Sequence, residues 1–463
     1  MAGQNAKDDP KQERLQMSFW DFCLVSNDSL FAGVQFDKSK DGKPATPRFC
    51  FPRGYQKPSE RSSATEAELK ADFFRLLHII EDVKANYGDK LPEEEKAPFD
   101  FPIRACLAVL QYWLDFGYFM ETETIYKKGL FGKINWPKTI KRVKPQVVKG
   151  ADGRYSVIYL DLISRLSRHK EDCLITLIHK YCVHYAAKTV GPLLSVSESE
   201  LDSPELDFDY AVFSETLNEK MSTTFNDRFL ELFQAMKEIV EYLKEKSTES
   251  GESADELHYG LKSFAYAWEY MVDRIFKTAE ASDYNPHLKF VATDAKDQNG
   301  ESFGDEDEKR SEAAEETHRS TLRPDTIMVG DNGDCFVLDS KYYKYGLTGN
   351  KTDLPGGDSV PKQMAYAEYV EKKKSVAAEH IYNAFILPFC AAAENGILPG
   401  NDENLCSFVA RRVGYIYGDW KDKSRPSHKI VCILLDMKSV MRYYASSKDA
   451  RKALAQMIRE GAK

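Results

Sequence analysis

The stretch RPDTIMVGDNGDCFVLDSKYYKYG, residues 323–346, decides the fold of the second half of this chain. Two apolar runs, 326–329 and 335–338, flank the turn sequence DNG at 331–333. Short apolar runs on either side of an Asn-Gly turn are typical of a β-hairpin. We therefore expect two paired strands here, with the acidic residues that border them brought close together.

The length of this turn decides which side chains share a face of the hairpin. A two-residue turn would pair Asp325 with Ser340 and send Asp339 to the opposite face. A three-residue loop pairs Asp325 with Asp339 instead. Lys341 follows two residues later and stays on the face of Asp339, because strand side chains alternate with a period of two. The three-residue register therefore places two carboxylates and an ammonium group together at the open end of the hairpin.

Two carboxylates at the end of apolar strands are costly unless a positive charge compensates them. One possibility is a salt bridge with Lys341 alone, and the other is a divalent cation. Carboxylate oxygens at this spacing suit Mg²⁺, with Mn²⁺ possible. Such a cation would polarise a phosphodiester and lower the pKa of a bound water, while Lys341 would orient that water or neutralise developing charge.

Pro324-Asp325 followed by Asp339-Ser340-Lys341, in a hairpin, resembles the signature of the PD-(D/E)XK nucleases. The resemblance implies an α/β (α+β) fold, with a helical N-terminal region and a restriction-endonuclease-like core whose mixed central sheet is flanked by helices. It implies that Asp325, Asp339 and Lys341 are catalytic. It also implies that the two aspartates, with the carbonyl of Ser340, hold the metal.

Two further segments extend this resemblance. In related nucleases an upstream helix supplies another acidic ligand, and Glu269 is the matching residue in a helix expected over 253–276. Downstream, LPGGDSVPKQMAY at 354–366 opens a helix that carries Gln363 and Tyr366. The resemblance implies that these two side chains support the site.

A finer resemblance is to the LlaJI-type restriction endonucleases, which are related to the McrC nuclease subunits. It rests on LDSKYY at 338–343, on the 354–366 segment and on FGKINWPKTIK at 131–141. It implies a metal-dependent endonuclease of a bacterial restriction, or phage-defence, system that cuts double-stranded DNA with a McrB-like AAA+ NTPase. The chain has no GxxxxGK[ST] motif of its own, which agrees with a separate NTPase. The alternatives are a non-catalytic DNA-binding or assembly subunit, or a repair or recombination nuclease.

Residues 126–149 (YKKGLFGKINWPKTIKRVKPQVVK) form a basic and aromatic stretch without an acidic residue. Basic residues are the natural contacts for DNA phosphates, and aromatic side chains can stack or pack. The residues expected to contact DNA are Lys133, Trp136, Lys138, Lys141 and Arg142. The alternative is a solvated basic face with Trp136 in the core.

Composition limits the remaining possibilities. The chain has 463 residues, with 64 basic and 73 acidic side chains and a net charge of −9. That balance argues against coating nucleic acid by bulk charge, and 42% apolar residues exclude a largely disordered chain. The nine cysteines are an odd number without a CxxC pair, which favours reduced thiols in the cytoplasm. No apolar run is long enough for a membrane span, so no membrane association is expected.

The organisation expected from these patterns has three parts. Residues 1–64 are a tail and loop-rich segment, residues 65–250 are mostly helical and contain the basic stretch, and residues 251–463 are the nuclease domain. Within the last part, the acidic segment 294–319 is expected to be a solvated, disordered loop.

Overall fold

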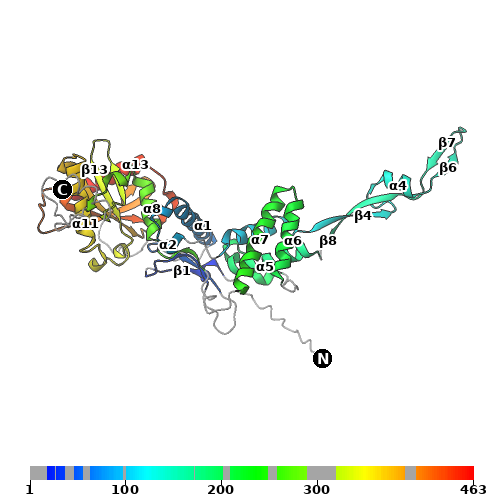
Figure 1. The fold of residues 1–463 in the computed structure, drawn as a ribbon, viewed down its shortest axis with the longest axis horizontal. Coiled ribbons are helices and arrows are strands. Elements are labelled where there is room, and N and C mark those ends of the chain that lie inside the picture. The colour runs from blue at the N-terminus through cyan, green and yellow to red at the C-terminus, as the bar shows by residue number, and fades with distance from the viewer. Residues whose placement is uncertain are drawn as a thin grey trace, which may run out of the picture. The chain divides into compact units, whose positions relative to one another are not determined.

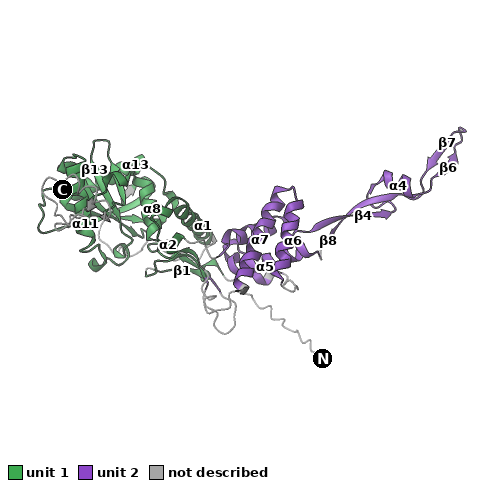
Figure 2. Cartoon of the chain, viewed as in Figure 1, with its two compact units in different colours: residues 1–35, 48–99, 258–463 green, residues 36–47, 100–257 purple. Residues whose placement is uncertain are grey.

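The computed structural model describes residues 18–26, 28–36, 46–55, 63–96, 101–170, 173–201, 209–248, 258–288, 320–391 and 403–463. The acidic segment 294–319 lies outside these ranges. The chain folds into two compact units, shown in Figures 1 and 2. Unit 1 comprises Met1–Gln35, Arg48–Phe99 and His258–Lys463, and unit 2 comprises Phe36–Pro47 and Asp100–Leu257. This division differs from the expected one, because residues 65–99 fold with the C-terminal part.

Unit 1 is built on a six-stranded mixed sheet with the order β12-β13-β14-β17-β16-β15. Strands β13, β14 and β17 run parallel, and the outer strands pair antiparallel. The strands are β12 (Thr326–Val329), β13 (Cys335–Ser340), β14 (Ile381–Phe389), β15 (Glu403–Leu405), β16 (Phe408–Tyr417) and β17 (Lys429–Asp436). The mixed central sheet expected from the sequence is confirmed.

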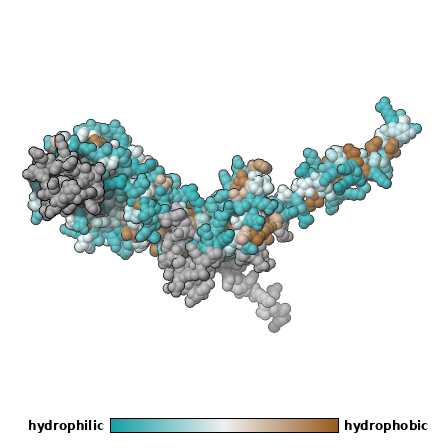
Figure 3. Space-filling view, viewed as in Figure 1, coloured by the Kyte–Doolittle hydropathy of each residue, from teal (hydrophilic) through white to brown (hydrophobic). Residues whose placement is uncertain are grey.

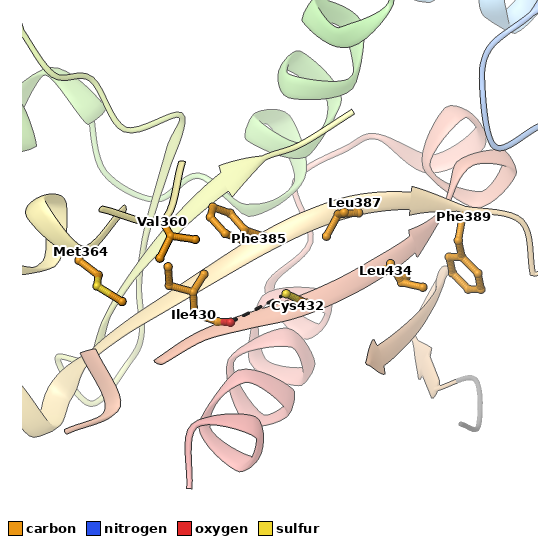
Figure 4. Close-up of a cluster of buried hydrophobic side chains, with 8 residues drawn as sticks. All are labelled: Val360, Met364, Phe385, Leu387, Phe389, Ile430, Cys432 and Leu434. Atoms are coloured by element: carbon orange, nitrogen blue, oxygen red, sulfur yellow. Dashed lines mark hydrogen bonds between the residues drawn. The ribbon is translucent and has the colours of Figure 1, made fainter. Parts of the chain in front are cut away.

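Helices cover both faces of this sheet. Helix α11 (Ser359–Lys373) packs on one face through Val360 and Met364. These two side chains meet alternate residues of β14 and β17, which form the apolar cluster in Figure 4. The other face carries α8 (Ala265–Phe276) and α13 (Lys448–Ala462), with α12 (Met437–Tyr443) against β16 and β17. Apolar residues on successive positions of β14 and β17 are needed because both faces are covered.

Unit 1 also contains a four-stranded sheet, with the order β1-β3-β2-β9, and the long helix α1 (Ser63–Asn86). Its strands are β1 (Cys23–Val25), β2 (Ala32–Phe36), β3 (Pro47–Phe51) and β9 (His258–Leu261). The buried Asp72 of α1 accepts hydrogen bonds from Arg442 of α12 at 2.7 and 2.8 Å. This buried ion pair ties α1 to the C-terminal core.

Two expectations are wrong in this region. Residues 1–64 are not only tail and loop, because β1, β2 and β3 lie there. The helix expected from 253 begins at Ala265, because residues 258–261 pair with β2 as β9. Residues 253–257, where the helix was expected to begin, lie outside the described residues. Pairing with a strand far away in the sequence prevailed over a local helix signal.

Unit 2 combines a helical bundle with an extended β-arm. The helices are α3 (Ile103–Phe116), α5 (Leu174–Leu194), α6 (Tyr210–Thr223) and α7 (Asp227–Thr248). The arm, residues 121–170, contains β4 (Glu121–Lys128), β5 (Lys133–Ile134), α4 (Trp136–Arg142), β6 (Gln146–Lys149), β7 (Tyr155–Ile158) and β8 (Ile163–Lys170). Figure 1 shows β4 and β8 leading from the helices to the β6–β7 hairpin. The prediction of mostly helix is therefore wrong for the arm.

No helix in the described ranges combines the length and the apolar character needed to cross a lipid bilayer. All nine cysteines are free thiols.

Candidate active site

The hairpin formed by β12 and β13 has the three-residue register. Thr326 pairs with Leu338 and Val329 with Cys335. The Gly330 N–H donates to the Asp334 carbonyl at 2.8 Å and closes the loop, in which Gly333 has a φ of +83°. Only glycine adopts this conformation readily. The register continues to Asp325 opposite Asp339, as the three-residue alternative predicts.

The open end of the hairpin brings together Asp325, Asp339 and Lys341. The Ser340 N–H donates to the Asp325 carboxylate at 2.8 Å. The Lys341 ammonium lies 2.8 Å from Oδ2 of Asp339, and Asp339 is only 5% exposed. Lys341 follows the last residue of β13, and its N–H donates to the Ile386 carbonyl of β14 at 2.9 Å. The neighbouring parallel strand therefore fixes the backbone from which Lys341 projects.

The charges of this cluster are unequally compensated. Burial, together with the nearby carboxylates of Asp339 and Glu269, raises the pKa of Asp325 well above its usual value. Burial acts to lower the pKa of Lys341, but the carboxylates of Asp339 and Asp325 outweigh it, so this pKa is raised. Within the described part of the chain, no ion pair involves Asp325. The cluster therefore has one carboxylate more than its lysine neutralises.

Glu269 lies on α8, and its charge reaches this cluster, because it contributes to the raised pKa of Asp325. Its Oε1 accepts a hydrogen bond from Lys90 at 3.1 Å and a short one from the Tyr87 hydroxyl. Burial, followed by the charge of Glu269 and that of Asp325, raises the pKa of Tyr87. Glu269 is therefore within electrostatic reach of Asp325, but its carboxylate is engaged by two side chains of the segment that follows α1.

Three residues of this neighbourhood were not expected from the sequence: Tyr87, Lys90 and Asp273. Asp273 lies one turn after Glu269 on α8 and accepts a hydrogen bond from Thr326 at 2.9 Å. Burial raises its pKa. The four-residue spacing from Glu269 could have pointed to Asp273, because residues i and i+4 share a helix face. Nothing local could have pointed to Tyr87 or Lys90.

The two expected supporting residues lie on α11, one turn apart. The Gln363 side-chain amide donates to the Val337 carbonyl of β13 at 2.7 Å, and Gln363 is fully buried. The Tyr366 hydroxyl donates to the Arg323 carbonyl at 2.7 Å. Both side chains therefore hold the backbone of the hairpin that carries the acidic residues.

A cleft of about 720 Å³ opens beside Asp325. Its wall carries side chains of both signs, so it can accept both a cation and a phosphate group. The charged lining residues are Asp89, Lys90, Asp273, Arg274, Lys277, Glu280, Arg323 and Asp325. All of them belong to unit 1.

The donor set of the site fits a hard divalent cation. Asp325 and Asp339 supply carboxylate oxygens, which such cations prefer. Ser340 Oγ and Gln363 Oε1 are buried without a hydrogen-bond partner, so two further oxygens have unused capacity. Among the residues that the structure describes, however, no three His, Cys, Asp or Glu side chains converge closely enough to form a cation site. The chemistry of the donors fits, while Glu269 is held by Lys90 and Tyr87.

The five residues expected to contact DNA lie on the arm of unit 2. Lys133 is on β5, and Trp136, Lys138, Lys141 and Arg142 are on α4. Trp136 is 51% exposed, so it is not a core residue. Asn135 caps α4 by accepting the Lys138 N–H at 3.0 Å.

The arm exposes many apolar as well as basic side chains, and Figure 3 shows brown patches among teal along it. Its exposed large apolar residues include Leu130, Phe131, Ile140, Val147, Tyr155, Val157 and Leu160. Exposed apolar surface rimmed by polar residues is typical of a surface that binds another macromolecule.

Comparison with known proteins places this site in a family. Among solved structures, a complex of McrB AAA+ hexamers with bound McrC from Thermococcus gammatolerans is similar, with 14% identity over 93% of this chain and 83% of that chain and a TM-score of 0.34. A comparison with curated proteins finds no match. The model of the LlaJI restriction endonuclease family matches residues 48–402, well over half of the chain and the whole hairpin. The chain therefore belongs to the LlaJI restriction endonuclease family.

Proposed function

We propose that this chain is a metal-dependent endonuclease of a bacterial restriction system that hydrolyses phosphodiester bonds in double-stranded DNA. The observation that carries the proposal is the position of Asp325, a half-buried carboxylate that faces the cleft, lies beside Asp339 and takes part in no ion pair of the described residues. A hairpin stabilised only by salt bridges would pair each carboxylate. Here the one lysine is engaged by Asp339.

Asp325, Asp339 and Glu269, with the Ser340 carbonyl, would hold Mg²⁺ or Mn²⁺. When bound, such a cation supplies Lewis-acid polarisation of the phosphodiester and a more acidic water. Lys341 remains protonated because its pKa is raised, so it can donate a hydrogen bond to a phosphate oxygen or to the attacking water. Gln363 and Tyr366 hold the hairpin backbone, so the acidic residues need little reorganisation.

The decisive experiment is cleavage of plasmid DNA in Mg²⁺ by the wild type and by Asp339→Ala and Lys341→Ala. We expect each variant to lose at least about 100-fold in rate, the usual effect of removing a charge-stabilising group. Asp419→Asn, which changes an exposed aspartate of the same unit, serves as the control and should cut normally. Equal cutting by the wild type and both site variants would refute the site and favour a non-catalytic DNA-binding or assembly subunit.

We further propose that a McrB-like AAA+ NTPase assembles with this chain. The chain contains no GxxxxGK[ST] motif, so nucleotide-driven work would require another subunit. Co-expression with an AAA+ NTPase encoded next to this reading frame provides the test. A stable complex whose cleavage depends on nucleotide is expected, whereas full cleavage by the chain alone would contradict the partnership.

A further inference from the structure

A second pocket lies at the closed end of the hairpin, on the opposite end of β12 from Asp325. Its volume is about 480 Å³. The lining residues come from the hairpin turn, from the segment after α8 and from α13. Those with polar or charged side chains are Thr278, Asp331, Asn332, Lys448, Arg451, Lys452 and Arg459.

The pocket is strongly basic. The side chains of Lys448 and Lys452 are 66% and 60% exposed and lie one helical turn apart on α13. Asp331 is the one carboxylate among the lining residues, and its Oδ2 lies 3.8 and 3.6 Å from the two ammonium groups. These distances exceed those of hydrogen bonds, so the two lysines keep donors for another acceptor.

The other two cations of the pocket have structural contacts. Arg459 donates to the buried Asp334 at 2.6 Å and to Asn332 at 3.0 Å, which fixes the turn against α13. Arg451 donates to the Ile275 carbonyl at 3.4 Å and to Ser446 at 2.6 Å. The pocket therefore combines two arginines held by hydrogen bonds with two exposed lysines, an arrangement that suits a phosphate group.

This pocket adjoins the cleft beside Asp325. Thr278 lines both openings. Its N–H donates to the Ile327 carbonyl at 3.0 Å and its hydroxyl accepts from Val329 at 2.6 Å, so it runs along the outer edge of β12. Asp331 follows Asp325 by six positions, of which Thr326–Val329 form β12, so at about 3.3 Å per residue the two residues lie at most about 20 Å apart. Along duplex DNA, 20 Å corresponds to about six base pairs at 3.4 Å each.

We infer that the pocket of Lys448, Arg451, Lys452 and Arg459 binds a backbone phosphate of the DNA substrate, within about six base pairs of the bond that is cut. The inference rests on the proposed function, since it names the part of the substrate that this end of the hairpin holds. The inference predicts that this pocket positions the duplex but does not recognise its base sequence, because phosphates carry no direct sequence information.

The test measures binding of a fluorescein-labelled 30-base-pair duplex by anisotropy in EDTA, so that no cleavage intervenes. We expect Lys448→Ala/Lys452→Ala to bind about 10-fold more weakly near 100 mM salt. The magnitude of its slope of log K against log salt should fall by about 0.9, the change expected when one phosphate contact is lost. Both side chains are exposed, so folding should be preserved.

A second variant tests the same pocket in the opposite direction. Asp331→Asn removes the one carboxylate from the lining, so it should tighten binding several-fold. Lys372→Ala/Lys373→Ala, which removes two exposed lysines from the end of α11, is the charge-matched control and should leave affinity nearly unchanged.

The outcomes separate this inference from the proposed function. Suppose that the wild type cuts DNA, that both double-lysine variants bind DNA as tightly as the wild type, and that Asp331→Asn does not bind more tightly. This result overturns the phosphate pocket alone. A pocket that took up only free anions would give the same result. If both double-lysine variants lose affinity equally, the effect is one of general charge, and the inference is also overturned. A wild-type chain that binds no duplex at all overturns both proposals.

Discussion

The Lys90 ammonium lies 3.1 Å from Oε1 of Glu269, although 179 positions separate the two residues in the sequence. Lys90 ends the short 3₁₀ helix Gly88–Lys90 that follows α1, and the neighbouring Tyr87 donates to the same carboxylate oxygen. The side chain of Lys90 is 16% exposed, so this contact is shielded from water. The orientation of Glu269 is thus set by the segment that connects α1 to the rest of the unit.

Tyr87→Phe should therefore lower the affinity for Mg²⁺ more than it lowers the rate of cleavage at saturating Mg²⁺. Without the hydroxyl, Glu269 loses a hydrogen bond that orients it, and such outer contacts typically affect metal affinity about 10-fold or more. We expect a rise of about that size in the Mg²⁺ concentration for half-maximal cleavage, with a similar rate at saturation. Tyr443→Phe, at a half-exposed tyrosine of the same unit, is the control. An unchanged metal titration would show that Tyr87 has only a packing role.

Asp325→Asn should raise the thermal stability of the metal-free protein and abolish the stabilisation by Mg²⁺. In EDTA the variant should melt a few degrees higher, on the order expected for relief of about 1 kcal/mol, because a half-buried carboxylate without an ion-pair partner is replaced by a neutral amide. In 10 mM Mg²⁺ the wild type should gain stability and the variant should not, since a ligand of the folded state alone must stabilise it. Equal gains in Mg²⁺ would contradict the role of Asp325 as a ligand.

Lys141→Ala/Arg142→Ala should weaken binding of duplex DNA if the arm contacts it. Both side chains are exposed on α4, so their removal should not affect folding. We expect about 10-fold lower affinity at low salt and a salt slope smaller by about 2. Lys188→Ala/Lys237→Ala, on α5 and α7 of the same unit, controls for net charge. If the arm variant and the control behave alike, the arm serves another partner.

His179 should make unit 2 sensitive to acid. It is fully buried on α5, and its Nδ1 accepts the Phe119 N–H at 2.9 Å just before the arm begins. Burial lowers its pKa to about 3, against about 6.5 in an unfolded chain. The unfolded state therefore binds the extra proton, and stability should fall by about 1.4 kcal/mol per pH unit from about pH 6.5 downward.

His179→Gln keeps an acceptor oxygen but cannot titrate. Urea unfolding of the wild type and this variant at pH 7.5 and pH 5 should show the variant losing about 2 kcal/mol less over that interval. His78→Gln, at an exposed histidine, should follow the wild type. Parallel losses in all three proteins would mean that other groups govern the acid response.

Local sequence signals predicted the hairpin and several of the helices well. The DNG turn between two apolar runs determined the strand pairing, and the helices at 359–373 and 227–248 follow apolar periodicity that the sequence displays. The acidic residues of the site could be predicted because they border these elements. Which of them share a face depended on the length of the turn, and the sequence allowed both a two-residue and a three-residue loop.

Long-range pairing could not be predicted in the same way. Lys90 contacts Glu269 only because α1 folds with the C-terminal part, and β9 exists only because β2 is available to pair with it. The arm was missed for a different reason. Its strand β7 is exposed on both faces, so it has no alternation of apolar and polar residues to identify it.

The discontinuity of unit 1 has a consequence for biosynthesis. The ribosome makes α1 early, then all of residues 100–257, and only afterwards the strands that carry Asp325 and Asp339. Synthesis proceeds at about 5–20 residues per second, so α1 waits roughly 10 seconds or more for its partners, while unit 2 can fold first. Because α13 packs on β14, β16 and β17, the sheet around Asp325 and Asp339 is complete only after the ribosome has made this helix. A nascent chain that ended before α13 would then contain unit 2 without the complete sheet that carries Asp325 and Asp339.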